Sequence, residues 1–400
     1  MARILYLTQV LPFPLNTGAK VRQYYVLRYL CQKHAVTLVS FVRPDDKLEH
    51  IEHLKSFCAA VHTVPMTRSR WRDGRAVLKG LVQRRPFIIV RDEVDPMRAL
   101  LARLAASGRF DFVHADQMSM AQYGLKELGS RRVLDMHNAF YLIVQRMADG
   151  EPNPAKRLIL RREARALARY EAELCREFDE VVFVTNEDRR AIETQISQFK
   201  IEVPDNRFHI IPICIDSTEK LPVAPIAQPF RVTAMGVMFW PPNAEGVMWF
   251  AREGWPQVHV QFPNACLTIV GKNPPPELTR LSGERNIEVA GYVPDLTQVL
   301  AETAVLIVPL HAGGGMRVKI LDAWSQALPL VSTSIGAEGI DIRDQENILI
   351  ADAVETFTQS VQRVLGDLTL NQHLRQNGRR WVEQKYEWRT VYAAWDKLYP

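Results

Sequence analysis

The chain of 400 residues has few cysteines and no long apolar run. Its five cysteines are scattered and never in C-x-x-C spacing, which argues against a disulfide framework and against a zinc site. No apolar run approaches the roughly 18 residues of a membrane span. The start, MARILYLTQV, predicts a strand and lacks the pattern of a signal peptide. We therefore expect a cytoplasmic protein.

Positive charge is in small excess overall, but it is unevenly distributed along the chain. Residues 1–225 contain 35 Lys and Arg against 27 Asp and Glu, a net +8, whereas residues 226–400 contain 15 against 18, a net −3. Residues 67–85 hold seven cations and one acid around apolar residues. This segment is typical of an amphipathic helix on an anionic membrane or against an anionic acceptor, and a solvated helix is the alternative. No recognition motif accompanies the surplus, so we expect no nucleic-acid partner.

A second basic helix is predicted at residues 155–177. Its glutamates, Glu163, Glu171 and Glu173, are spaced to pair with cations along the helix. This spacing favours an ordinary solvated helix.

Short apolar runs alternate with helical patterns through both halves of the chain. The length suits two domains, and the alternation predicts α/β domains with doubly wound parallel sheets. A proline-bearing stretch at 216–229 reads as a linker. We place one domain at 1–222 and the second at 223–379, with a helix at 380–400 that packs back on the first.

Polar side chains follow two apolar runs of the first half. His114 and Asp116 end the run FDFVHAD, and Asp135, His137 and Asn138 end the run RRVLDMHN. Loops at the carboxyl edge of a parallel sheet carry function, so these residues are candidates for an active-site rim. For His137 alone, a hydrogen-bonded structural histidine is the alternative.

A glycine loop between two strands marks the second half. The sequence reads VLIVPL, HAGGG, a helix, PLVSTS and IGAEGI from residue 305 to residue 340. Gly313, Gly314 and Gly315 put bare backbone at the start of a helix, which creates an anion site to which Arg317 and Lys319 add positive charge. The alternative is a structural turn in which Lys319 and Asp322 form a surface pair at i, i+3.

The stretch HAGGGMRVKILDAWSQALPLVSTSIGAEGI resembles the carboxyl-terminal signature of family 4 retaining glycosyltransferases, which have the GT-B fold. GKN, GYVPD and IIPICID stand in the family's order, and the resemblance is strongest at 230–350. It implies two Rossmann-like domains that face a cleft, with a C-terminal helix crossing back. It also implies that a sugar passes from a nucleotide-diphosphate sugar to an acceptor hydroxyl with retention of configuration, in polysaccharide, glycolipid or other glycan biosynthesis.

The resemblance assigns roles to individual residues. Asp322 stands where the family has the second Glu of E-x7-E, which holds the donor ribose, and Gly314 stands where the first Glu would be. The cation pair that often follows the first strand of the second domain is not evident after Gly236, where Asn243 and Glu245 occur instead. His137 would face the donor sugar, and Arg317 and Lys319 would neutralise the diphosphate. The expected donor-binding residues are Gly18, Gly236, Gly313, Gly314, Gly315, Asp322, Gly336, Ala337, Glu338 and Gly339.

No Asp-X-Asp motif occurs, so we expect no metal and no cofactor beyond the nucleotide-sugar co-substrate. The acceptor would be a glycan, a lipid-linked molecule or a small molecule, and residues 67–85 would allow peripheral binding to the inner face of a membrane. Two other functions stay open: a GT-B hydrolase or epimerase using Asp116, Asp135 or Glu338, and a nucleotide-sugar-binding protein without catalysis. A nicotinamide dehydrogenase is disfavoured, because no G-x-G-x-x-G follows the first strand of either half.

Overall fold

The computed structural model describes residues 1–67, 69–124, 128–226 and 230–400, which divide into two units. Unit 1 contains Met1–Cys214 and Trp388–Pro400, and unit 2 contains Ile215–Glu387. The sequence analysis placed these borders near 222 and 379. The structure differs because the described part of the expected linker bonds along unit 2, for example from the N–H of Val223 to the carbonyl of Gln326 at 3.0 Å.

Unit 1 is built on a parallel sheet of seven strands in the order β3-β2-β1-β4-β5-β6-β7. Apolar, β-branched runs form the strands and are covered on both faces, as is usual for parallel sheets. The chain order reverses between β1 and β4, which is where doubly wound sheets bind ligands. The strands are β1 Arg3–Thr8, β2 Ala35–Val42, β3 Ala60–Pro65, β4 Phe110–Asp116, β5 Gly129–Met136, β6 Glu180–Phe183 and β7 Phe208–Ile210.

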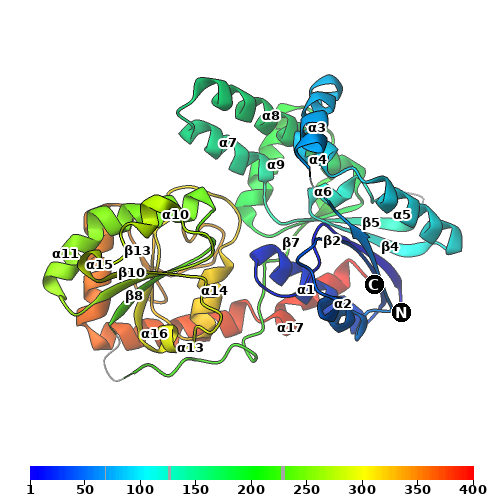
Figure 1. Ribbon diagram of the computed structural model, residues 1–400. Helices are drawn as coiled ribbons and strands as arrows, with labels where there is room; N and C mark the ends of the chain where they lie inside the picture. The colour runs from blue at the N-terminus through cyan, green and yellow to red at the C-terminus, as the bar shows by residue number, and fades with distance from the viewer. Residues whose placement is uncertain (68, 125–127, 227–229) are drawn as a thin grey trace. The chain divides into compact units, whose positions relative to one another are not determined.

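The helices of unit 1 cover both faces of this sheet, with α1 and α2 on one face and α5, α6 and α8 on the other (Figure 1). They are α1 Gly18–Cys31, α2 Leu48–Lys55, α3 Arg70–Gln83, α4 Phe87–Arg91, α5 Asp95–Ser107, α6 Met118–Ala121, α7 Phe140–Gly150, α8 Pro154–Glu177, α9 Asn186–Gln198 and the 3-10 turn η1 Asp205–Arg207.

Unit 2 repeats the plan with a parallel sheet of six strands in the order β10-β9-β8-β11-β12-β13. Its order reverses between β8 and β11. The strands are β8 Arg231–Met235, β9 Cys266–Val270, β10 Ile287–Gly291, β11 Thr303–Val308, β12 Leu330–Ser332 and β13 Leu349–Ile350.

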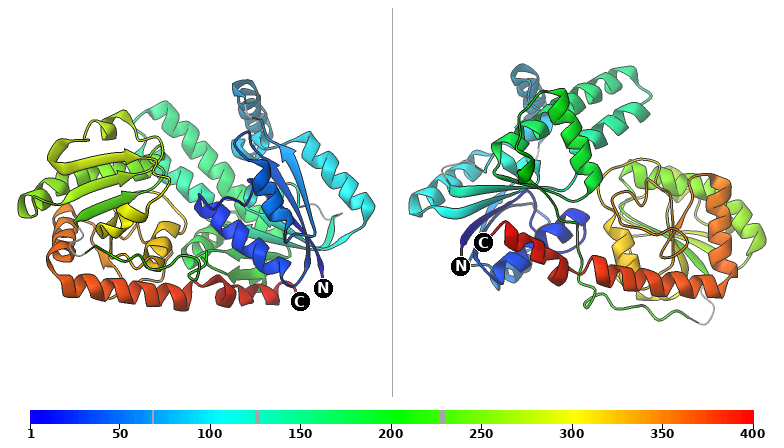
Figure 2. Two further views of the ribbon diagram at one scale, coloured as in Figure 1. Left: turned by 60° about the horizontal axis from the view of Figure 1, so that its bottom comes forward. Right: turned by 180° about the vertical axis from the view of Figure 1, so that it is seen from behind.

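The helices of unit 2 likewise lie on both faces, with α10 and α11 opposite α13 and α16 (Figures 1 and 2). They are α10 Pro241–Trp249, the π turn η2 Phe250–Gly254, α11 Trp255–Gln261, α12 Pro276–Thr279, the 3-10 turn η3 Glu284–Asn286, α13 Thr297–Ala301, α14 Val318–Ser325, α15 Val354–Gly366 and α16 Leu368–Lys385. The predicted α/β fold with two doubly wound sheets is confirmed. Within the described residues, no helix combines the length and apolar character that crossing a membrane requires.

The C-terminal segment returns to unit 1, but not as one helix. The helix expected at 380–400 is interrupted, because α16 ends at Lys385 and two short turns follow it, α17 Trp388–Val391 and η4 Tyr392–Lys397. Their aromatic rings pack on α1: Trp388 stacks on Tyr25 with ring centroids 5.6 Å apart, and Trp395 lies over the guanidinium of Arg22 at 5.6 Å. Burial of these rings explains why the tail is so rich in aromatic residues.

A fully buried ion pair joins three segments of unit 1. Arg22 of α1 donates from Nε and Nη2 to the carboxylate of Asp135 at the end of β5, with the shorter contact at 2.6 Å. Its Nη1 donates to the carbonyls of Ile211 and Pro212, after β7, at 2.8 and 3.1 Å. Because Nε and Nη2 bond Asp135 while Nη1 bonds the carbonyls after β7, the guanidinium links α1, β5 and the chain beyond β7.

Replacing Arg22 tests this pair. Arg22→Met leaves Asp135 buried without its counter-charge, so we expect the free energy of unfolding in urea to fall by about 3–5 kcal/mol. Arg22→Met with Asp135→Leu should regain much of that loss. The control is Lys55→Met, which breaks the exposed Lys55–Glu52 pair and should cost less than about 1 kcal/mol. Equal losses in the two single variants would contradict a structural role for the buried pair.

Candidate functional site

The glycine loop of unit 2 lies between β11 and α14, at the carboxyl edge of the sheet. Gly313 and Gly315 have φ of 122° and 73°, a region that side-chain-bearing residues rarely adopt. α14 begins at Val318 without a side-chain cap. The N–H of Ile320 in its first turn donates to the carbonyl of Arg317 at 2.9 Å. The positive end of the helix dipole faces the loop ahead of it, a position that favours an anion.

Arg317 stabilises this loop through hydrogen bonds. Its Nη1 donates to the carbonyls of Gly314 and Gly315, so the guanidinium lies folded over the glycines. The cation expected for phosphate binding thus sits at the loop itself, immediately before the first residue of α14.

Lys319 reaches the neighbouring strand end. Its Nζ donates to Oδ1 of Asn243 at 3.0 Å and lies 2.9 Å from where a Cβ on Gly236 would be. Burial lowers the pKa of Lys319 to about 7, and the charge of Arg317 acts in the same direction. A cation from α14 therefore fills the space beside the β8–α10 loop, where the sequence provides no cation of its own. A Cβ at position 236 would require the ammonium of Lys319 and the amide of Asn243 to shift.

Asp322 faces another way. Its carboxylate pairs with the ammonium of Lys220, so Lys319 and Asp322 do not form the surface pair considered from the sequence. Asp322 stays partly exposed in unit 2. A carboxylate offers more acceptor positions than one ammonium uses, so hydroxyl groups can still bind it.

The second glycine loop closes over the same sheet edge. Gly336 lies so near β11 and β12 that a Cβ would come within 2.4 Å of the carbonyl oxygen of Val308, and its N–H donates to Thr333 Oγ1 at 2.9 Å. Ala337 is buried, Glu338 is half-buried and Gly339 has a φ of 79°. Both loops and Gly236 thus follow β8, β11 and β12, around the point where the strand order reverses.

In unit 1, His137 is held by two side chains. Its Nε2 lies 2.8 Å from Asp116 Oδ1, and its Nδ1 lies 3.1 Å from Nε2 of Gln117. The amide nitrogen of Gln117 can only donate, so Nδ1 accepts and Nε2 carries the proton toward Asp116. Gly18 lies elsewhere in unit 1, as the first residue of α1, which is capped by the hydroxyl of Thr17.

The prediction that these polar residues form an active-site rim is only partly correct. His114, Asp116 and Asp135 are fully buried beneath the sheet edge, because Arg22, Tyr399 and His137 bond them from inside. Burial lowers the pKa of His114 to about 3, so this ring is neutral. Burial raises the pKa of Asp116. At Asp135 burial acts in the same direction, but the charge and the hydrogen bond of Arg22 together with the neighbouring histidines outweigh it, so the pKa of Asp135 is lowered.

The same three residues form the one group in the described chain whose ligand atoms could hold a metal ion, all within 4.8 Å of one another. Their carboxylates, however, are already bonded to Arg22, Gln23 and His137. The guanidinium supplies the positive charge that a metal would bring. These residues therefore do not fit a resident metal.

Two buried carboxyl groups hold the loop that carries His137. The N–H groups of Phe140 and Tyr141 donate to Glu171 at 2.8 and 3.0 Å, and the N–H of Ala139 donates to Asp188 at 2.8 Å. Burial raises the pKa of Glu171 to about 8. The expectation that Glu171 pairs along α8 is wrong, and its apolar neighbours Leu167, Ala168 and Ala172 were the available sign that this position faces inward.

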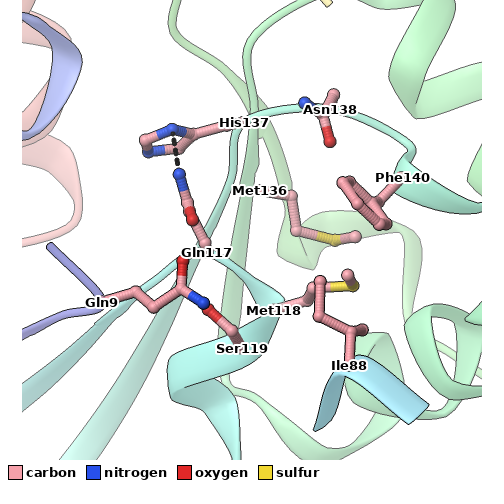
Figure 3. Close-up of a pocket in the computed structure, with 9 residues that line it drawn as sticks. All are labelled: Gln9, Ile88, Gln117, Met118, Ser119, Met136, His137, Asn138 and Phe140. Atoms are coloured by element: carbon pink, nitrogen blue, oxygen red, sulfur yellow. Dashed lines mark hydrogen bonds between the residues drawn. The ribbon is translucent and has the colours of Figure 1, made fainter. Parts of the chain in front are cut away.

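His137 also lines a pocket of about 110 Å³ at the carboxyl ends of β1, β4 and β5 (Figure 3). The pocket lies wholly in unit 1. Its walls combine amide side chains with methionine and phenylalanine, and the sequence analysis identified only His137 and Asn138 among its residues.

Comparisons with known proteins agree with this geometry. Residues 229–367 match the family model "Glycosyl transferases group 1". Over 98% of its length the chain is 21% identical to 99% of an uncharacterized 44.6 kDa protein in the cps region of Klebsiella pneumoniae. The match to this family model lies within unit 2.

Solved structures that match nearly the whole chain establish the fold. Sucrose-phosphate synthase of Thermosynechococcus elongatus superimposes with a TM-score of 0.70 at 16% identity, covering 99% of this chain and 98% of that one. HepE of Anabaena, solved with UDP and glucose, gives 0.69 at 12% identity, covering 100% and 99%. The chain has the GT-B fold.

Anion binding at the glycine loop should depend on pH through Lys319. With a pKa of about 7, Lys319 is an ammonium at pH 6 and mostly an amine at pH 9, so its contribution to anion affinity should fall by up to about tenfold per pH unit above 7. We expect pyrophosphate to stabilise the wild type against heat more than it stabilises Lys319→Met, by a margin that shrinks from pH 6 to pH 9. Lys385→Met, an exposed lysine of α16, is the control. A margin independent of pH would contradict a role for this ammonium.

Proposed function

We propose that the protein is a family 4 retaining glycosyltransferase that moves a sugar from a nucleotide-diphosphate sugar to an acceptor hydroxyl. The observation that carries the proposal is the convergence of Arg317, Lys319 and the start of α14 on one glycine loop at the switch point of unit 2. HepE, solved with UDP and glucose, supports a UDP-sugar as the donor class. The relative in the cps region supports polysaccharide biosynthesis.

The main electrostatic demand of this reaction is the negative charge that develops on the departing diphosphate. Arg317, Lys319 and the α14 dipole are fixed groups that stabilise such charge without reorganising. Lys319, poised near pH 7, takes a proton when the anion arrives and becomes a full ammonium. No metal is required in this scheme, in line with the absence of an Asp-X-Asp motif from the sequence.

Other residues would bind and orient the substrates. Asp322 accepts hydrogen bonds from the ribose hydroxyls, and the loop of Gly336, Ala337, Glu338 and Gly339 closes over the donor. His137 orients a sugar or acceptor hydroxyl and is not a nucleophile, because its protonated Nε2 is committed to Asp116.

The rival functions are less well supported. A hydrolase or epimerase would need an accessible acid or base. Of its three candidates, Asp116 and Asp135 are fully buried, which leaves only the half-buried Glu338. A binding protein without catalysis was suggested by Gly314 in place of a Glu, but Lys319 beside Gly236 supplies a cation that a turning-over enzyme would use. Formation of a new glycosidic linkage distinguishes transfer from hydrolysis and from binding alone.

The transfer reaction can be tested with a panel of UDP-sugars and glycan acceptors in excess EDTA. We expect a new glycoside and free UDP in equal amounts. Lys319→Met and Arg317→Met should each lower kcat/KM by roughly 10²-fold, the scale for loss of one electrostatic stabiliser, while Lys385→Met keeps wild-type activity. Wild-type turnover in both variants would refute the leaving-group assignment, and activity that returns only with Mg²⁺ or Mn²⁺ would refute metal independence.

We infer further that an apolar and basic face of unit 1 contacts an anionic membrane surface. On α3, Leu78 and Val82 are 65% and 78% exposed; on α8, Leu158 and Ile159 are 71% and 66% exposed. Arg162 of α8 donates to the carbonyl of Gly80 on α3 at 3.3 Å, so the two helices touch at this point. Both helices thus present exposed apolar side chains on unit 1.

The charge of this face is smaller than the sequence suggests. Lys79 and Arg85 both pair with Glu93. Arg75 and Arg84 are exposed, whereas Arg68 and the side chains of Arg70 and Arg72 lie outside the described part of the chain. Attraction would therefore combine a few cations, each worth about 1 kcal/mol near an anionic surface, with burial of the apolar residues.

Co-sedimentation with vesicles tests this face. We expect binding to anionic vesicles at low salt that weakens at high salt, since the charges are screened within about 10 Å at 0.1 M. Leu78→Ser with Val82→Ser should weaken it further, whereas Val260→Ser, an exposed apolar residue of α11, should not. Equal, negligible sedimentation with anionic and neutral vesicles would refute membrane binding. The acceptor would then be a soluble glycan or a small molecule.

A further inference from the structure

The pocket beside His137 has walls suited to one class of ligand. Three amide side chains, those of Gln9, Gln117 and Asn138, face it together with the ring of Phe140 (Figure 3). A carboxamide both donates and accepts hydrogen bonds, which matches hydroxyl groups. An aromatic ring offers an apolar face against which the C–H face of a sugar ring packs. The pocket therefore has the amphipathic character of a pyranose.

The surroundings disfavour an anion. None of the residues that line the pocket in the described chain is a lysine or an arginine, and two carboxyl groups lie directly behind the lining. Asp116 contacts His137 at 2.8 Å, and Asp92 accepts a hydrogen bond from the amide of Gln9. A phosphate or carboxylate bound here would lack the counter-charge that such groups require when they leave water. An uncharged ligand has no such requirement.

Two features show that the pocket is incomplete without a ligand. Ser119 is 4% exposed and lines the pocket, yet its Oγ has no hydrogen-bond partner, and buried hydroxyls are nearly always bonded. Gln117 has φ 67° and ψ 155°, a conformation normally confined to glycine and found mainly at ligand sites and switches. The strain places its amide on Nδ1 of His137, where a ligand hydroxyl would otherwise donate.

We propose that this pocket takes an uncharged pyranose ring of the acceptor, one of whose hydroxyls replaces the Gln117 amide on Nδ1 of His137. The assignment to the acceptor rests on the proposed function, since the glycine loops and cations of the donor site lie in unit 2. The volume of about 110 Å³ is below the roughly 300–1,000 Å³ of sites that enclose a drug-sized ligand. It holds one sugar ring in part, with the next group outside.

Saturation-transfer NMR on the full chain tests the proposal with methyl glycosides of glucose, galactose, mannose and N-acetylglucosamine, and with methyl glucuronide as the matched anion. We expect at least one neutral glycoside to bind and the glucuronide to bind at least tenfold more weakly. The octyl glycoside of the same sugar distinguishes a lipid-linked acceptor from a soluble one. Tighter binding of the octyl than of the methyl glycoside indicates a lipid-linked acceptor, and equal affinity of the two indicates a soluble acceptor. Absence of binding by every neutral glycoside, or equal binding of the glucuronide, overturns the proposal.

Two variants locate the binding. Gln117→Gly suits the backbone at this position, so it should fold, and Ser119→Ala removes only a hydroxyl. Ser119→Ala should weaken glycoside binding by about five- to tenfold, the scale of one hydrogen bond between neutral groups. Gln117→Gly should strengthen it, because no amide then competes with the ligand hydroxyl for Nδ1 of His137. Gln32→Ala, an exposed glutamine at the end of α1, should leave it unchanged. Unchanged binding in both pocket variants would overturn the assignment even if UDP-sugar turnover persists, whereas loss of turnover on every donor with intact glycoside binding would refute the proposed function alone.

Discussion

The buried pair of Arg22 and Asp135 is the interaction on which unit 1 depends. It neutralises a carboxylate at the end of β5, one strand position from the loop that carries His137, and it joins α1 to the chain beyond β7. The aromatic C-terminal segment covers the same guanidinium through Trp395. Removing two charges from water is costly unless each is paired and bonded, so this cluster requires α1, β5 and the tail to be in place together. The position of His137 is fixed as a consequence.

Unit 2 shows how one α/β scaffold can supply the same charge from a different part of the chain. α10 offers Asn243 where the family resemblance predicts a cation, and Lys319, 76 residues later, occupies the space beside it. Gly236 favours this position, because a side chain there would displace the ammonium. The cost is a lysine whose pKa is lowered toward neutrality. Such a group is a weak cation when the site is empty and a strong one when a diphosphate is bound.

The sequence predicted the fold well, because alternating apolar runs and helical patterns are local signals. The glycine loop and His137 could also be found, since glycines before a helix and polar residues after a strand have characteristic spacing. Arg22 could not, because an arginine in an amphipathic helix reads as a surface residue unless its distant partner is known. The strain at Gln117 and the contact between Lys319 and Asn243 are set by tertiary packing and leave no local pattern.

The most direct test of the central claim, that Lys319 neutralises the diphosphate of the donor, is calorimetry of UDP binding at pH 8 in buffers of different ionisation enthalpy. At this pH Lys319 is mostly an amine in the free protein, and UDP carries its full charge. The wild type should take up close to one proton per UDP bound, and Lys319→Met should take up none. Equal proton uptake by the two proteins would contradict the claim.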